Sequence, residues 1–175
     1  IKQRVKLLNK QMTEIDADIA AIVSKHEWLK KKLEYVCSIK GVALLSAVII
    51  VAETNGFNLV RNKKQLVSYA GLDVVGKESG ISVKGKTKIS RKGNKYLRKS
   101  LHFPALVAIR HNEQMKAMYN RLLSRHGIKM KAAVAVQKKI LEFVYVLWKK
   151  EEMFDQQYLK SKGQQLEVAT LCELA

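Results

Sequence analysis

The stretch AAVAVQKKILEFVYVLWK, residues 132–149, is apolar on nearly every side of a helical wheel. A helix of this composition is buried all round, so we expect it to form the centre of the fold. The whole chain holds only nine Gly and one Pro in 175 residues. Such low counts disfavour a turn-rich β-sandwich or barrel. The sequence therefore predicts an all-α protein.

Shorter helices are expected on the N-terminal side of this centre. Their segments are residues 44–52, 62–70, 92–109 and 113–125. Gly127 is expected to cap the end of the last one, and Pro104 either kinks the helix over 92–109 or starts a new segment. Residues 71–90 hold four glycines among Asp, Lys and Ser, which predicts a Gly-rich basic loop in which a small hairpin can form.

A long amphipathic arm occupies residues 1–36. Its apolar positions alternate at spacings of four and three, with His26 in one of them: Ile1, Val5, Leu8, Met12, Ile15, Ile19, Ile22, Leu29, Leu33 and Val36. This heptad pattern is typical of a coiled coil. A helix of about 36 residues is about 54 Å long, more than a small domain can cover. We therefore expect residues 1–36 to pair with a second chain, as a homodimer or larger assembly; packing on its own domain is the alternative.

The pattern divides the chain into a coiled-coil arm (1–36), a compact helical domain (37–155) and a C-terminal tail (156–175). Residues 39–43, IKGVA, lie between two expected helices and are similar to the turn of a helix-hairpin-helix unit, in which backbone amides receive a DNA phosphate. Ala43 stands where such a unit usually has its second glycine, so a plain interhelical turn is the alternative. Because the sequence begins with Ile1 rather than Met, we expect it to be part of a longer protein.

The composition predicts a polyanionic partner. Lys and Arg number 33 against 15 Asp and Glu, a net charge of +18, in a chain that is 47% hydrophobic. Each neutralised phosphate releases counterions and adds affinity that is independent of sequence, so nucleic acid is the first candidate. An anionic membrane surface is the second, but the basic segment has few apolar anchors. The longest apolar run, residues 42–52, is shorter than the about 20 residues that span a bilayer, so we expect no membrane partner.

The positive charge is concentrated in residues 61–99. This segment carries twelve basic and two acidic residues, a net charge of +10. Surfaces that are merely solvated usually mix the two signs. We therefore expect this segment to contact nucleic acid.

Several other kinds of site are disfavoured. Residues 80–87, GISVKGKT, satisfy the letters of a phosphate-binding P-loop, but the preceding strand is weak and Gly93 interrupts the helix that should follow. The four histidines show no i, i+4 pairing and the cysteines form no CxxC motif, so no metal site is expected. Cys37 and Cys172 lie far apart behind no secretory signal, which favours a reducing compartment over a disulfide.

A set of ordered motifs resembles one known family. These are Phe57, QLVSYAGL at residues 65–72, Ser79-Gly80, ISRKGNKYLR at residues 89–98, and Leu101. In order and spacing they resemble the C-terminal transposase domain of the bridge-RNA-guided insertion-sequence transposases, whose other domain carries a DEDD metal-binding quartet. The resemblance is close over residues 57–101 and loose over nearly all of the remaining chain.

The resemblance implies that Ser79 is a nucleophile that forms a covalent phosphoserine link to a DNA strand; a turn residue beside Gly80 is the alternative. Nearby cations and a close backbone approach at glycine stabilise the charge that develops on the phosphate. Residues 93–94 are expected to open the next helix, either with amides that face an anion or as a structural N-cap alone. The predicted nucleic-acid-binding residues are Gly80, Lys84, Lys86, Lys88, Arg91, Lys92, Gly93, Asn94, Lys95 and Arg98.

The resemblance also implies partners and a cofactor. The partners are DNA and a guide RNA, for transposition and recombination of a bacterial mobile element in the cytoplasm, close to the nucleoid. Mg²⁺ is expected in an N-terminal domain that precedes the coiled coil, and no cofactor is expected in this chain. We therefore expect this chain alone to bind nucleic acid without cutting or rejoining DNA. The rival interpretation is a non-catalytic helix-hairpin-helix nucleic-acid-binding module.

Overall fold

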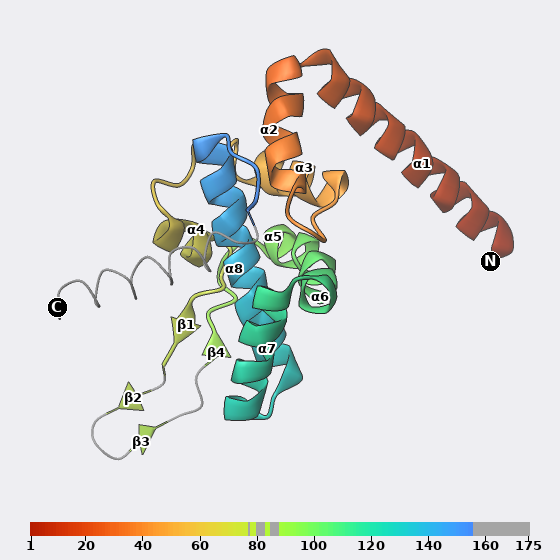
Figure 1. Ribbon diagram of the computed structural model, residues 1–175. Coiled ribbons are helices and arrows are strands. Elements are labelled where there is room, and N and C mark those ends of the chain that lie inside the picture. The colour runs from red at the N-terminus through yellow and green to blue at the C-terminus, as the bar shows by residue number, and fades with distance from the viewer. Residues whose placement is uncertain (77, 80–82, 85–87, 156–175) are drawn as a thin grey trace.

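Helices make up most of the computed structural model, which describes residues 1–76, 78–79, 83–84 and 88–155, with the backbone alone at 78–79 and 83–84. The elements in chain order are α1 (Lys2–Lys25), α2 (Glu27–Cys37), α3 (Leu44–Glu53), α4 (Lys63–Tyr69), β1 (Val74–Val75), β2 (Glu78–Ser79), β3 (Val83–Lys84), β4 (Lys88–Ile89), α5 (Lys95–Ser100), α6 (His102–His111), α7 (Glu113–His126) and α8 (Lys129–Lys150). The described strands are only two residues long. The expected all-α class is confirmed (Figure 1).

The last helix of the described residues, α8, lies in the middle of the molecule (Figure 1). α2, α4, α6 and α7 all pack against it. Its buried residues are Ala132, Ala133, Val136, Gln137, Ile140, Leu141, Val144, Leu147 and Trp148. Removing one large apolar side chain from water contributes about 1.5–3 kcal/mol, so this helix supplies a large share of the core. The prediction made for residues 132–149 is confirmed.

Asparagine side chains begin three of the helices. Asn62, Asn94 and Asn112 each accept hydrogen bonds from backbone N–H groups of the first turn, as good N-caps do. α7 ends at His126 and is followed by the expected C-cap Gly127, which has φ +67°. The helix expected over 92–109 is instead two helices joined at Leu101. Pro104 lies in the first turn of α6, where a missing N–H breaks no helical bond.

The N-terminal arm is interrupted at His26. The expectation of one continuous helix over residues 1–36 is wrong at this position, because His26 has φ −120° and ψ 93° between α1 and α2. α2 packs on α3 and α8, with Leu33 and Val36 only 1% and 0% exposed. Burial of these side chains in the protein's own core takes precedence over a continuous heptad seam.

The other half of the arm, α1, extends away from the body of the molecule (Figure 1). Most of its heptad positions are exposed: Ile1, Val5, Leu8, Met12, Ile15 and Ile22. The two halves of one sequence pattern therefore have different environments. Pairing of the exposed half with a second chain stays a prediction.

The turn between α2 and α3 packs against α6. Gly41 has φ +102°, and a Cβ at this position would lie 2.8 Å from the carbonyl oxygen of Pro104. Glycine alone combines this backbone conformation with so close an approach. Ile39 and Val42 on either side are buried. This packing accounts for the glycine as part of an interhelical turn, while the helix-hairpin-helix phosphate site stays a prediction.

None of the helices among the described residues is long and apolar enough to cross a bilayer. Cys37 is half-buried and forms no disulfide with a described residue. Cys172 belongs to the tail 156–175, which lies outside the described residues. The prediction that Cys37 and Cys172 form no disulfide therefore stays a prediction.

Candidate nucleic-acid interface

The basic loop between α4 and α5 is a hairpin with two antiparallel strand pairs. β1 pairs with β4 in the register Val74↔Ile89, and β2 pairs with β3 in the register Ser79↔Val83. The hairpin extends away from the helices (Figure 1). The candidate nucleophile therefore has its backbone in β2, in the part of the hairpin away from the helical core.

The P-loop-like letters at residues 80–87 fall on this hairpin. Val83–Lys84 and Lys88–Ile89 are strands, where a P-loop has its loop and the first turns of a helix. The described parts of this segment thus differ from a P-loop. Gly80 and Lys86, both predicted to bind nucleic acid, lie outside the described residues.

Two hydrogen bonds close the base of the hairpin. Ser90 donates its backbone N–H to the carbonyl oxygen of Asp73 at 2.9 Å and its hydroxyl to the Asp73 carboxylate at 2.5 Å. Asp73 is one of only two acids in residues 61–99. Because its carboxylate accepts this bond, Asp73 joins the two ends of the hairpin at its base.

The chain crosses itself closely where Gly93 lies against Gly71. A Cβ on Gly93 would lie 2.2 Å from the carbonyl oxygen of Tyr69 and 2.4 Å from the nitrogen of Gly71. Because both neighbours are backbone atoms, they cannot move aside as a flexible side chain would. Gly93, predicted to contact nucleic acid, is therefore required by the crossing itself. Contact with a ligand stays a prediction.

Arg98 holds this crossing together. Its Nη1 donates to the carbonyl oxygens of Ala70 at 2.7 Å, Gly93 at 2.9 Å and Asn94 at 3.2 Å. Its Nη2 donates to the carbonyl oxygen of Arg91 at 3.4 Å. Arg98 was predicted to bind nucleic acid, but much of its hydrogen-bonding capacity is used within the fold. Sequence alone gives no sign of this, because the four acceptors are main-chain atoms.

Asn94 is likewise engaged within the protein. Its Oδ1 accepts from the N–H groups of Tyr96 at 2.8 Å and Leu97 at 3.3 Å, and its Nδ2 donates to Glu53 at 2.6 Å. The amides expected to face an anion therefore already have an acceptor. Of the two alternatives for residues 93–94, the structural N-cap describes the observed bonds.

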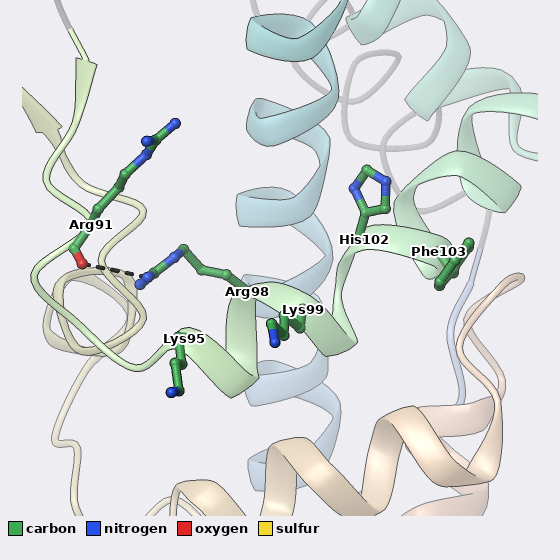
Figure 2. Close-up of a pocket in the computed structure, with 6 residues that line it drawn as sticks. All are labelled: Arg91, Lys95, Arg98, Lys99, His102 and Phe103. Atoms are coloured by element: carbon green, nitrogen blue, oxygen red, sulfur yellow. Dashed lines mark hydrogen bonds between the residues drawn. The ribbon is translucent and has the colours of Figure 1, made fainter. Parts of the chain in front are cut away.

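An open groove beside this crossing is lined by basic side chains. Its residues are Arg91, Lys95, Arg98, Lys99, His102 and Phe103, from the loop before α5, from α5 and from the start of α6. In the view of Figure 2, Lys99 lies between the two arginines and the His102–Phe103 pair. Arg91, Lys95 and Lys99 are exposed. These are side chains that can neutralise backbone phosphates. Nζ of Lys95 also lies over the ring of Tyr96, 5.1 Å from its centroid.

Sequence reasoning missed His102 and Phe103 as members of this site, and it included Lys99 only within the basic segment 61–99. The signal for Lys99 is its spacing of four from Lys95, which brings two cations to one face of a helix. His102 and Phe103 belong to the next helix, so no single helical period connects them with Lys95. Finding them requires knowing that the chain turns at Leu101.

The groove lies in a segment of one sign of charge. No Asp or Glu occurs between Glu78 and Glu113 in the sequence, so the hairpin's second half, α5 and α6 carry cations alone. Lys88 and Lys92 are also exposed. Clustered charge of one sign raises the local concentration of a polyanion and speeds its association.

Neither thiol chemistry at Cys37 nor metal binding among the described residues is favoured by the structure. Burial, with a smaller effect of Glu34, raises the pKa of the Cys37 thiol, which keeps it protonated and a poor nucleophile. Within the described ranges, no three His, Cys, Asp or Glu side chains come together to hold a metal ion.

Comparison with known proteins points to one family. Residues 33–120 match the model of the transposase IS116/IS110/IS902 family. The pilin gene-inverting protein of Moraxella lacunata is 24% identical over 148 residues, 82% of this chain and 45% of that protein. Its counterpart in Moraxella bovis is 23% identical over 145 residues, with the same coverage. The chain thus spans about half the length of these two curated relatives.

The residues matched by the family model include the whole hairpin, the glycine crossing and the basic groove. They make up half of the chain, which therefore belongs to the IS116/IS110/IS902 transposase family.

Proposed function

We propose that this chain is the DNA-binding, serine-bearing part of a recombinase that moves a bacterial insertion element. Its family is one of transposases, and the two relatives are named for inverting a pilin gene, which is a rearrangement of DNA. The observation that carries the proposal is the segment without acids between Glu78 and Glu113. This segment supplies much of a projecting hairpin and the groove beside it.

Ser79 is the proposed nucleophile. Its hydroxyl proton passes to a base while Oγ attacks the phosphorus of a DNA phosphodiester. The Oγ–P bond forms, the bond from phosphorus to one sugar oxygen breaks, and that oxygen leaves with a proton. One DNA end is then held as a phosphoserine, and attack by the hydroxyl of another DNA end releases the serine and exchanges the strands.

Cations favour this reaction because the phosphoryl group and its departing oxygen carry negative charge in the transition state. The exposed cations nearest to the described base of the hairpin are Lys88 at its foot and Arg91 and Lys92 just after it. The proposed roles of Lys84 and Lys86 rest on sequence, because Lys84 is described by its backbone alone and Lys86 lies outside the described residues.

The Mg²⁺ implied by the family resemblance is proposed to bind in a preceding domain. The described residues bring together no carboxylate cluster that fits such an ion, so no step proposed for this chain passes through a metal. We expect the 175-residue chain to bind nucleic acid and to leave DNA uncut.

Pairing and guide-RNA binding are parts of the same proposal. The exposed apolar seam of α1 suits a second copy of this helix in a coiled coil. The cationic surface suits a guide RNA as well as DNA, because both present phosphates. DNA and guide RNA are both available in the bacterial cytoplasm, where we place the protein close to the nucleoid.

The test is Ser79→Ala in the whole protein, assayed for protein covalently joined to DNA after denaturation. We expect the adduct to disappear while affinity for DNA stays within about twofold, since one neutral hydroxyl adds no counterion release. Ser82→Ala, another serine of the same segment, is the matched control and should keep the adduct. An adduct that survives Ser79→Ala contradicts Ser79 as the nucleophile and assigns that role to another residue. Recombination that Ser79→Ala leaves unchanged favours the non-catalytic helix-hairpin-helix module.

A further inference from the structure

One side chain of the basic groove is not a cation. Phe103, near the start of α6, is 74% exposed. A phenylalanine ring left in water forgoes the stabilisation that burial would provide. Cations alone would suffice for holding phosphates. The exposed ring of Phe103 gives this groove a surface for a second, apolar kind of contact.

The Phe103 ring is held from the core side. The ring of His102 meets it edge to face, with centroids 5.6 Å apart and planes at 67°. Nδ1 of His102 lies 3.2 Å from Nε2 of Gln137, and Gln137 belongs to the central helix α8 and is 4% exposed. A buried amide thus orients the histidine, and the histidine supports the exposed ring.

The surroundings of Phe103 distinguish between classes of partner. Lys99 is exposed one turn earlier in the chain, with Lys95 and Arg91 beyond it in the same groove (Figure 2). Cations that follow a backbone and an aromatic ring that stacks on a base form the usual site for single-stranded nucleic acid. In a duplex the base faces are covered by their neighbours. The phosphates of a duplex would therefore contact the cations, while no base would stack on the ring.

We propose that Phe103 stacks on an unpaired nucleobase while Lys99, Lys95 and Arg91 hold the phosphates beside it. This deepens the proposed function and rests on it, since it concerns the form of nucleic acid that the groove accepts. The unpaired base belongs either to a DNA strand opened during recombination or to a single-stranded part of a guide RNA. Both present the same ring face and the same phosphates.

The experiment measures the affinity of the 175-residue chain, as wild type and as Phe103→Ala, for four labelled ligands. They are oligodeoxyuridylate, oligouridylate, an abasic strand with the same number of phosphates, and a DNA duplex. We expect Phe103→Ala to weaken binding of the two strands with bases by about 5- to 150-fold. Binding of the abasic strand and the duplex should change by less than about twofold, because their phosphates are held by cations alone.

Two further variants keep the outcome clear. Phe103→Trp restores a stacking ring and should return single-strand affinity to near the wild-type value. Leu106→Ala removes an exposed apolar side chain on the same helix, 39% exposed, and should leave affinity for every ligand unchanged. Oligouridylate and oligodeoxyuridylate share one base and differ in the 2′-hydroxyl. A larger loss for oligouridylate assigns the site to RNA, and a larger loss for oligodeoxyuridylate assigns it to DNA.

Several results overturn the stacking role. An equal loss of affinity for single strand, abasic strand and duplex in Phe103→Ala shows a general effect on the surface. No loss of affinity for any ligand shows that the ring does not contact nucleic acid. Loss of self-association in Phe103→Ala and Leu106→Ala, with single-strand affinity intact, assigns the ring to a protein contact. Each of these leaves the proposed function standing, because wild-type binding is retained. Failure of the wild-type chain to bind any of the four ligands contradicts the proposed function itself.

Discussion

Arg98 and Lys99 are neighbours on the short helix α5, yet their environments are opposite. The Arg98 guanidinium donates to four backbone carbonyl groups of the surrounding loops. Lys99 lines the same groove with an exposed side chain. One cation stabilises the loops and the other is free to meet a ligand, so positive charge in a family motif does not by itself identify a binding residue.

The difference separates stability from binding. Arg98, Asn94 and Gly93 hold the crossing of two loops and set the direction in which the hairpin leaves the body. Lys95, Lys99 and Phe103 lie on the surface that this crossing positions. Changes to the first set should lower the free energy of unfolding, and changes to the second should lower affinity alone.

The largest effect is expected for Gly93→Ala. Its Cβ would lie 2.2 Å from a carbonyl oxygen, so the two loops must separate and the hydrogen bonds around them must break. We expect the free energy of unfolding to fall by about 3 kcal/mol or more, measured by urea denaturation.

Gly76→Ala is the matched control, because a Cβ at Gly76 meets no described atom within 4 Å. This variant should unfold within about 0.5 kcal/mol of the wild type. A Gly93→Ala protein that is equally stable would show that the crossing is loose, and the separation between the two sets of residues would no longer hold.

Arg98→Lys should have the next largest effect. Lysine keeps the charge but cannot donate in several directions from one planar group, so some of the four carbonyl contacts are lost. A hydrogen bond that involves a charged group contributes about 1.5–3 kcal/mol. We expect the free energy of unfolding to fall by about 2 kcal/mol. Thermal and urea denaturation would measure this change.

The binding measurement for the same variant tests the assignment of Arg98. Affinity for nucleic acid, measured well below the melting temperature, should stay within about threefold of wild type because the charge remains. A folded Arg98→Lys protein that binds nucleic acid tenfold more weakly would show that Arg98 contacts the ligand directly.

How much the sequence predicts depends on the range of the interaction that decides each feature. The central helix, the caps at Gly127 and Asn94 and the basic hairpin follow from local composition and spacing, and the structure contains them. The break at His26 does not, because the heptad pattern continues through it and burial of Leu33 and Val36 decides the outcome. Tertiary packing is absent from a one-dimensional pattern.

The same reasoning applies to the candidate site. Residues 84–98 are basic enough to identify the region, and the family motif draws attention to Ser79. Which cations are free depends on where main-chain carbonyls lie, and Arg98 finds its acceptors as far away as Ala70, 28 positions back in the sequence. His102 and Phe103 enter the site only because α5 and α6 meet at Leu101.

The smallest effect, and the one that sharpens the comparison most, is expected for Lys99→Ala. An exposed lysine with no hydrogen bond or ion pair to a described residue contributes little to stability, so the free energy of unfolding should change by no more than about 0.5 kcal/mol. Affinity for single-stranded nucleic acid should fall severalfold at low salt. The slope of log affinity against log salt should become shallower by about 0.7, the value for one phosphate contact on a single strand. Because salt dependence counts ionic contacts, an unchanged slope in Lys99→Ala would place Lys99 outside the path of the phosphates even if affinity fell.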